Sequence, residues 1–483
     1  MSQQTPDPAP HLRLVENEAA PAPEPERDPV TGLMQRAGFE VALEAALAER
    51  DEEPTPLALY LLDFPQFGDI ARGARRDTRL AFLAAIGDRL ARHAGAEGLA
   101  ARLDGARFAL LMPAPRGGES GEIEAARLVE AVASQERLVD GTDAVLRPGI
   151  GYALTPDDTE HALDVLGGHE TGRHLERFAE AAASLFSCAS LALEHAVGGA
   201  GEAPVRFSPA LVIARRRVAE LARAIGPAIA SGEIKVAFQP VMDIATKRLS
   251  GFEALLRWRH PEFGPVPPPE AVAIAEQNGQ MCALTRHVMR QAIACCRDWP
   301  DHLTFAVNVT PSQLNQALVA QIAEVLEEGG VAPSRLEIEV TEDALIRDIE
   351  SSARVIDAIR KLGVRVAMDD FGAGFTSLRN LRQLAFDKIK IDRSLCEGLG
   401  ENERTDAIVS GLVHLAGTLG IAATIEGVET DEQLAALEGL PCLVQGYVFS
   451  PPVPPSGMEI FRPLLGRRTG RQRSRPAAIK AVS

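Results

Sequence analysis

The chain has 483 residues, of which 46% are hydrophobic and 24% are charged, and its formal net charge is −17. This length predicts two globular domains with tails, and the balance of residue types is that of an ordinary globular protein. The acidic charge argues against DNA or RNA as a partner, because affinity for a nucleic acid depends on Lys and Arg neutralising phosphates. A small phosphate ligand remains compatible, since bound divalent cations can reverse the local charge of an acidic pocket.

Neither the apolar runs nor the cysteines point to a secreted or membrane-spanning protein. No apolar run approaches the roughly 20 residues that cross a bilayer, and the N-terminal stretch lacks the basic and apolar regions of a signal peptide. The six cysteines show no CxxC pair and no zinc-site spacing, so buried free thiols explain them. We therefore expect a cytoplasmic protein without a membrane span.

Taken in chain order, the sequence predicts a leader, two domains, a linker and a tail. Residues 1–27 are rich in Pro, Ala and Glu and are expected to be disordered. Residues 28–196 mix Ala-rich amphipathic helices with strand-like runs and predict a smaller α/β domain. Residues 197–230 are expected to be a linker and a connecting helix. Residues 463–483 form a basic tail, either disordered or docking on an acidic surface or anionic lipid.

Residues 231–462 alternate short apolar runs with helix-length amphipathic segments, which favours a parallel sheet with crossover helices. The strand-like runs are residues 235–241, 252–258, 304–309, 335–340, 364–368, 388–391, 422–427 and 444–449. Eight βα units over about 230 residues are the size of a (β/α)8-type barrel. The predicted fold class is therefore α/β, with a C-terminal barrel after a smaller α/β domain.

Oxygen-bearing or cationic side chains lie at or near the C-terminal ends of these runs. They are Glu253, Asn308, Glu339, Asp369, Asp370, Lys390, Glu426 and Gln445. In a barrel the carboxyl ends of the strands converge on one face, where active sites form. Charges inside apolar strands are costly unless they are paired or bind a metal. We therefore interpret the set as one site.

Each of these positions also has an ordinary structural explanation. The paired aspartates alone would more often cap a helix or lie in a loop. Glu253 could be a buried ion-pair partner of Arg257, four residues further on, and Asn308 could cap the helix that follows. Lys390 could extend its ammonium group to solvent from a strand. All of these explanations must hold together for the site to be absent.

The residue types favour hard divalent cations and phosphate chemistry. Carboxylates and an amide oxygen, without His or Cys, suit Mg²⁺ or Mn²⁺ rather than zinc. Asp369 and Asp370 could flank two ions, the arrangement used for in-line attack on a phosphodiester. Lys390 could lower the pKa of a metal-bound water or hold the resulting hydroxide, and Arg257 offers a guanidinium group to a phosphate oxygen.

Eight motifs follow one another along the whole of this block. They are FQPV from Phe238, FEALLRW from Phe252, VNVTPSQL from Val307, EVTE from Glu339, MDDFGAGFTSL from Met368, KIKIDRS from Lys388, IEGVET from Ile425 and QGYVFSPP from Gln445. In this order they resemble the EAL domain of cyclic di-GMP phosphodiesterases. The resemblance implies a barrel that opens cyclic di-GMP to linear pGpG with two Mg²⁺ or Mn²⁺ ions. It also implies a homodimer formed through this domain.

The resemblance further implies a role for each matching residue. The metal ligands would be Glu253, Asn308, Glu339 and Asp369, with Asp370 and Glu426 around the second ion. The catalytic set would be Lys390, which holds the attacking water, with Glu253 and Glu426. The substrate contacts would be Gln239, Arg257 and Gln445. Glu342 would steady the loop of residues 371–378, in which Ala373, Phe375 and Thr376 depart from the family's usual residues.

The first block contains two motifs, DPVTGLMQRAGFE from Asp28 and RLDGARFALLMP from Arg102. They resemble the opening and the signature of a GGDEF diguanylate cyclase domain. Ala106 and Arg107 replace carboxylates that a cyclase needs, Asp63 is the metal-type acid that remains, and the RxxD motif is absent. We therefore expect a degenerate domain with a regulatory or dimerising role and no cyclase activity.

A second function stays open for the whole chain. The barrel could be a non-enzymatic receptor that binds cyclic di-GMP and signals through a protein partner. Such receptors usually lack one or more of the metal ligands, whereas this sequence keeps them all. The sequence therefore favours the phosphodiesterase.

Overall fold

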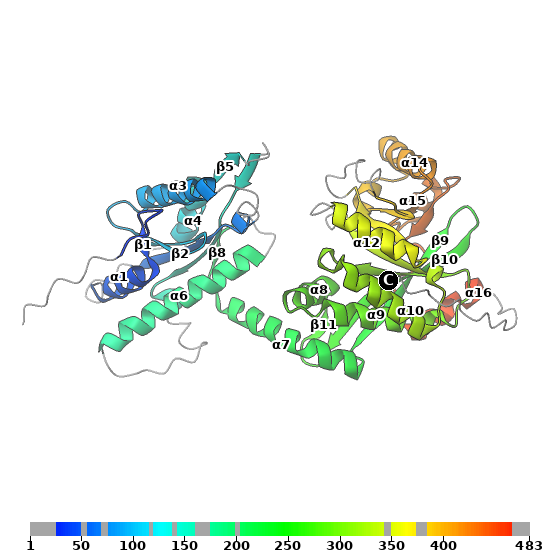
Figure 1. Ribbon diagram of the computed structural model, residues 1–483, viewed down its shortest axis with the longest axis horizontal. Helices are drawn as coiled ribbons and strands as arrows, with labels where there is room; N and C mark the ends of the chain where they lie inside the picture. The colour runs from blue at the N-terminus through cyan, green and yellow to red at the C-terminus, as the bar shows by residue number, and fades with distance from the viewer. Residues whose placement is uncertain are drawn as a thin grey trace, which may run out of the picture. The chain divides into compact units, whose positions relative to one another are not determined.

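The computed structural model describes residues 26–49, 56–68, 76–114, 119–137, 143–159, 174–198, 203–341, 349–372 and 384–465. The chain divides into two compact units, Met1–Arg217 and Val218–Ser483, and each is described by itself (Figure 1). The division falls within residues 197–230, the segment expected to join the domains. Almost all of the expected leader and most of the expected basic tail lie outside the described residues.

The first unit contains a six-stranded mixed sheet of order β1-β3-β4-β2-β7-β8. Its strands are β1 (Met34–Gln35), β2 (Leu57–Asp63), β3 (Leu99–Asp104), β4 (Arg107–Pro113), β7 (Gly149–Leu154) and β8 (Val205–Arg206). A separate hairpin joins β5 (Ser134–Arg137) and β6 (Asp143–Leu146). The helices are α1 (Arg36–Glu49), α3 (Arg76–Ala94), α4 (Glu119–Val132) and α6 (His174–Gly198). This arrangement confirms the predicted α/β class.

Strand β2 shows why this sheet is buried on both faces. Its alternate residues Ala58, Tyr60 and Leu62 belong to the cluster that includes the buried side chains of α3 and α4. The intervening Leu57, Leu59 and Leu61 belong to the cluster of α1 and α6. Because side chains alternate along a strand, the continuous apolar run LALYLL places one set under each pair of helices (Figure 1).

Helix α6 corrects one expectation from the sequence. Its residues Phe178–Gly198 are long and apolar enough to cross a membrane by length and composition, alone among the described helices. Leu185, Cys188 and Ala192 of this helix are buried in the core against the sheet. At Gly151 of β7 a Cβ atom would clash with the backbone of Leu193, so glycine lets helix and sheet approach closely. Packing inside the unit thus accounts for the apolar composition of α6.

The second unit is a closed eight-stranded barrel, as predicted. Its strands are β9 (Ile234–Asp243), β10 (Arg248–His260), β12 (Thr304–Val309), β13 (Leu336–Thr341), β14 (Arg365–Phe371), β15 (Lys388–Ile391), β16 (Ala422–Ile425) and β17 (Leu443–Gln445). They follow one another around the barrel in the order β10-β12-β13-β14-β15-β16-β17-β9, and β9 pairs back with β10 to close it. The short β11 (Gly264–Val266) pairs antiparallel with the end of β10.

One strand runs against the others, and this corrects the expectation of eight βα units. β9 is antiparallel to both β10 and β17, whereas the remaining barrel pairs are parallel. Only residues 244–247 separate β9 from β10. A turn of this length makes a hairpin, because a parallel crossover needs a dozen or more residues.

Helices cover the outside of the barrel and leave its interior to polar side chains. The helices are α8 (Pro268–Gln277), α9 (Met281–Cys296), α10 (Gln316–Gly329), α12 (Ile349–Lys361), α14 (Glu403–Thr418), α15 (Asp431–Ala436) and α16 (Arg462–Leu465), preceded by α7 (Pro209–Ser231). Outward-facing Val307, Ile338 and Ile389 belong to the main core cluster with the helices. Their strand neighbours Glu339 and Lys390 point inward and contact each other. The apolar core therefore lies between the strands and the helices, and the polar side chains inside the barrel are available to form a functional site.

Candidate functional site

A buried lysine lies at the centre of the predicted site. Nζ of Lys390, on β15, is 2.7 Å from Oε1 of Glu426 and 2.9 Å from Oε2 of Glu339. It is also 3.1 Å from Oδ1 of Asp369 and 3.6 Å from Oε2 of Glu253. We call these four acids the acidic cluster. They come from β10, β13, β14 and the residue directly after β16, so strands distant in sequence converge on one ammonium group.

Two amide side chains hold Glu253 in place. Asn308 Nδ2 donates to Glu253 Oε1 at 2.6 Å. Gln445 Nε2 donates to Glu253 Oε2 at 2.5 Å and to Gln239 Oε1 at 3.1 Å. Asn308 therefore does not cap the following helix, where Asn315 occupies the N-cap of α10 instead. The structure thus brings Gln239, Asn308 and Gln445 together around Glu253.

The electrostatics of this cluster combine burial with an excess of negative charge. Burial acts to lower the pKa of Lys390, but the carboxylates of Glu253, Glu339 and Glu426 outweigh it and raise that pKa well above its ordinary value. Burial and the charge of Glu253 raise the pKa of Glu339 well above its usual range. Burial, with the nearby Asp369, raises the pKa of Glu426 to about 7 although Lys390 acts in the opposite direction.

The pKa of Glu253 is shifted in the opposite direction from the pKa values of Glu339 and Glu426. Burial would raise the pKa of Glu253, but Lys390 and the hydrogen bonds from Gln445 and Asn308 together lower it. Four carboxylates share one ammonium group, so negative charge is in excess within a site that is almost closed to water. Such a surplus favours the binding of cations.

A cavity of about 260 Å³ opens over this cluster. Six of the residues predicted from the sequence line it: Gln239, Glu253, Asp369, Lys390, Glu426 and Gln445. Arg393, Glu429 and Tyr447 also line it and were not predicted. All three lie within the motifs that carry the resemblance. Arg393 and Glu429 follow the ends of their strand-like runs, and Tyr447 is an aromatic residue inside its run, so a search for charged or amide side chains at strand ends did not select them.

A glycine positions the exposed aromatic side chain of this cavity. A Cβ atom at Gly446 would clash with the backbone oxygen of Val428, so only glycine lets the end of β17 approach the turn after β16. The next residue, Tyr447, is 62% exposed at the rim. A cation (Arg393) and an aromatic ring therefore stand beside the acidic cluster, where a ligand would enter.

Some predicted residues lie apart from the cluster. Arg257 lines a separate cavity of about 680 Å³ with Lys235, and its Nη1 donates to the backbone oxygen of Leu256 at 2.7 Å. It does not pair with Glu253, because residues four apart on one strand are about 13 Å from each other. Asp370 has an exposed side chain and a φ of 56°. Glu342, Ala373, Phe375 and Thr376 lie outside the described residues.

In the first unit the guanidinium group of Arg107 pairs with Asp63, the acid that the sequence left as a possible metal ligand. Arg107 Nε donates to Asp63 Oδ2 at 2.9 Å, and this hydrogen bond raises the pKa of Arg107. Ala106, beside it, is buried and carries no polar group. A positive side chain thus neutralises Asp63, the acid that the sequence singled out for a cation.

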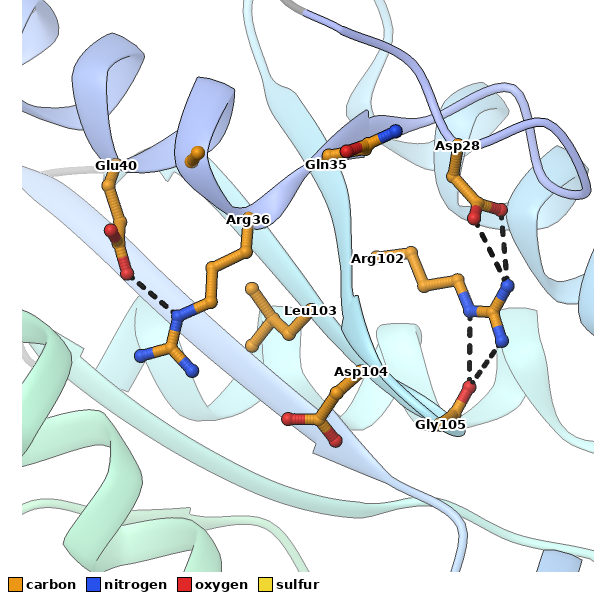
Figure 2. Close-up of a pocket in the computed structure, with 9 residues that line it drawn as sticks. Asp28, Gln35, Arg36, Glu40, Arg102, Leu103, Asp104 and Gly105 are labelled. Carbon is orange, nitrogen blue, oxygen red and sulfur yellow. Dashed lines mark hydrogen bonds and ion pairs between the residues drawn. The ribbon is translucent and has the colours of Figure 1, made fainter.

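A cavity of about 550 Å³ in the same unit lies between the start of α1 and the turn joining β3 and β4. Figure 2 shows Arg102 facing Asp28 and Arg36 facing Glu40 in its wall. Arg102 Nη1 donates to both carboxylate oxygens of Asp28 at 3.2 Å, and its Nε and Nη2 donate to the backbone oxygen of Gly105. Arg36 pairs with Glu40 at 2.8 Å. These contacts fasten the opening turn of the domain onto the turn that carries the altered signature.

Comparison with known proteins gives the family. The model of the EAL domain matches residues 220–452, and that of the diguanylate cyclase GGDEF domain matches residues 26–171. An uncharacterized signaling protein of Caulobacter vibrioides is 35% identical over 90% of this chain and 52% of its own length. Cyclic di-GMP phosphodiesterase NbdA of Pseudomonas aeruginosa is 30% identical over 90% of this chain and 53% of its own length. The chain therefore spans about half the length of these relatives.

A solved structure supports the order of the two domains. The S helix-GGDEF-EAL structure of LapD from Vibrio cholerae, bound to c-di-GMP, has a TM-score of 0.55 with 16% sequence identity. The match covers 88% of this chain and 96% of that one, so the two share a fold. The family models, the relatives and this likeness agree, and the chain belongs to the family of proteins that carry a GGDEF domain followed by an EAL domain.

Proposed function

We propose that the barrel hydrolyses cyclic di-GMP to linear pGpG and so lowers the level of this second messenger. The observation that carries the proposal is the convergence of four carboxylates on one buried lysine at the carboxyl ends of the strands. The family and the activity named for NbdA agree with it. Tyr447 and Arg393 at the rim of the cavity suit a guanine ring and a phosphate.

The residues present fit a pair of hard divalent cations, Mg²⁺ or Mn²⁺. Their donors are carboxylate and amide oxygens, and Asp369 Oδ1 is buried without a hydrogen bond among the described residues although Lys390 lies near it. Among the described residues, no three acidic, imidazole or thiol groups are arranged so that they could hold a metal ion, because the four acids point toward Lys390. Binding would therefore turn some of these carboxylates away from the lysine.

We assign Glu253, Asn308, Glu339 and Asp369 to one ion and Asp370 with Glu426 to the second. Bound ions would supply positive charge at the phosphodiester and at the attacking water. Lys390 stays protonated and orients that water by donating a hydrogen bond, because its carboxylate neighbours stabilise its charge. Gln239, Gln445 and Arg257 are the proposed substrate contacts, and Glu342 the residue that steadies the following loop.

For the first unit we propose a regulatory role without synthesis of cyclic di-GMP. Arg107 pairs with Asp63 and Ala106 offers no ligand, so the acids that a cyclase uses to hold its metal are missing or neutralised. We further propose a cytoplasmic protein that forms a homodimer through its EAL domain.

The test is to incubate the purified protein with cyclic di-GMP and Mg²⁺ and to separate the products by chromatography. We expect linear pGpG, and no cyclic di-GMP when GTP is supplied instead. Tight binding without any product would favour the receptor and overturn the phosphodiesterase. Formation of cyclic di-GMP from GTP would overturn the proposal for the first unit.

A further inference from the structure

A second charged pair lies in the barrel interior directly below the acidic cluster. Lys388 and Glu337 precede Lys390 and Glu339 by two residues on the same strands, so they face the same way. Lys388 Nζ lies 2.7 Å from Glu337 Oε1, and both side chains are buried. The lumen therefore contains two charged layers, the lower of which is electrically neutral.

Between the two layers lies a small cavity of about 10 Å³. Three of its lining residues carry a buried polar atom with no hydrogen-bond partner among the described residues: Glu337 Oε2, Thr424 Oγ1 and Gln445 Oε1. The three residues are only 2%, 1% and 4% exposed. A buried polar atom without a partner is costly, so three around one small cavity indicate a bound group.

Size and hydrogen-bonding capacity identify that group. A cavity of about 10–15 Å³ holds one water molecule, and a buried water commonly makes about three hydrogen bonds. Water can donate to the carboxylate oxygen of Glu337 and to the amide oxygen of Gln445 while it accepts from the hydroxyl of Thr424. A cation is disfavoured, because the two acids that line the cavity, Glu337 and Glu339, are already paired with Lys388 and Lys390.

We propose that one buried water occupies this cavity and fixes the orientation of the Gln445 amide. Gln445 presents Nε2 to Glu253 and Oε1 to the cavity. A turned amide would face the Glu253 carboxylate with its oxygen, and the two would repel. The water holds the amide the right way round and so ties the lower ion pair to the acidic cluster. Thr424 and Glu337 are thus positioning residues; the effect on turnover, unlike the water itself, rests on the proposed function.

The first test is a high-resolution crystal structure of the protein. We expect density for one water within hydrogen-bond distance of Glu337 Oε2, Thr424 Oγ1 and Gln445 Oε1. In Thr424→Val, which keeps the shape of the side chain but removes its hydroxyl, we expect this density to weaken or disappear. An empty cavity in the parent protein, or one filled by a side chain, overturns the proposal.

The second test is kinetic and uses matched variants. Thr424→Val should lower kcat for cyclic di-GMP about tenfold, as for the loss of one buried hydrogen bond, with KM little changed. Thr424→Ser, which keeps the hydroxyl, should recover most of that loss. Thr285→Val removes another buried hydroxyl, bonded to Gln313 at 3.1 Å outside this cavity, and should lower the melting temperature without lowering kcat.

The outcomes separate this inference from the proposed function. If the parent protein hydrolyses no cyclic di-GMP while the water is present, the proposed function fails and the water site stands. If the parent is active and Thr424→Val matches it in kcat, the positioning role fails. If Thr285→Val loses as much kcat as Thr424→Val, the loss reflects general destabilisation and the positioning role fails as well.

Discussion

Glu253 is the side chain that contacts both the amide groups and the lysine of the site. Glu253 accepts hydrogen bonds from Asn308 and Gln445 and faces Lys390. Removing it would leave two buried donors without an acceptor. The informative change is therefore one that keeps the volume of the side chain.

We predict that Glu253→Gln loses at least about 100-fold in kcat, because an electrostatic group at a reacting centre contributes about that much. Its melting temperature should fall less than that of Glu253→Ala, because the amide oxygen of glutamine still accepts one of the two hydrogen bonds. Rates are measured by chromatography of the product and folding by circular dichroism. Glu262→Gln, an exposed change on the turn after β10, is the control. If the variant keeps a tenth of the parent rate, the assignment of Glu253 as a catalytic and metal-binding residue is wrong.

The cysteines allow a second prediction at this scale. Burial raises the pKa of Cys188, Cys296 and Cys396 to about 12 and that of Cys442 to about 11. Cys282 is exposed. Because the thiolate is the reactive form, iodoacetamide at neutral pH should label Cys282 first in the folded protein. Mass spectrometry after a short pulse checks this, and equal labelling of Cys188 would contradict the packing of α6.

At the scale of single elements, the turn after β17 depends on one glycine. Gly446→Ala should destabilise the protein by about 1–3 kcal/mol, the usual cost of overpacking, and should displace Tyr447 and Gln445 from the cavity. Urea denaturation gives the stability. Gly411→Ala, inside α14 where a Cβ meets no atom within 4 Å, should instead stabilise by about 0.5–1 kcal/mol. Equal effects of the two changes would contradict the close approach of Gly446 to Val428.

The strands show what the sequence could and could not predict. The apolar runs located every barrel strand, because each must pack its outer face on helices. Lys388 stands in the same run as Lys390, yet only the charge nearer the strand end was interpreted as functional. The reversed direction of β9 was missed because a strand-like run carries no direction of its own. Pairing across the barrel, as between Lys388 and Glu337, depends on closure, which periodicity does not encode.

At the scale of the molecule, we predict that hydrolysis of cyclic di-GMP at the acidic cluster requires added Mg²⁺ or Mn²⁺. Ca²⁺ prefers longer bonds and more ligands, so it should bind and yet suppress turnover. Product formation after treatment with a chelator, followed by addition of each cation in turn, measures this. Equal rates with Ca²⁺ and Mg²⁺ would indicate that the cation holds the substrate without taking part in the chemistry.

The role of the first unit is tested by removing it. A chain that begins at Ala210 keeps Leu221, Ile225 and Ala228 of α7, which pack in a cluster of the second unit. We expect this truncated protein to change in rate while its product stays the same. Identical rate, metal requirement and oligomeric state would leave the first unit without a regulatory role. Steady-state kinetics and size-exclusion chromatography supply the comparison.

The barrel closes through a seam that joins distant parts of the chain. β17 pairs with β9 through only three residue pairs, Leu443 with Asp243, Val444 with Met242 and Gln445 with Val241. Contacts between segments so far apart in sequence form late in folding, because the entropy of closing the intervening loop must first be overcome. Gln445 belongs both to this seam and to the group that holds Glu253. A nascent or partly folded barrel therefore lacks a complete site, and the proposed hydrolysis of cyclic di-GMP would begin only once the last strand has docked.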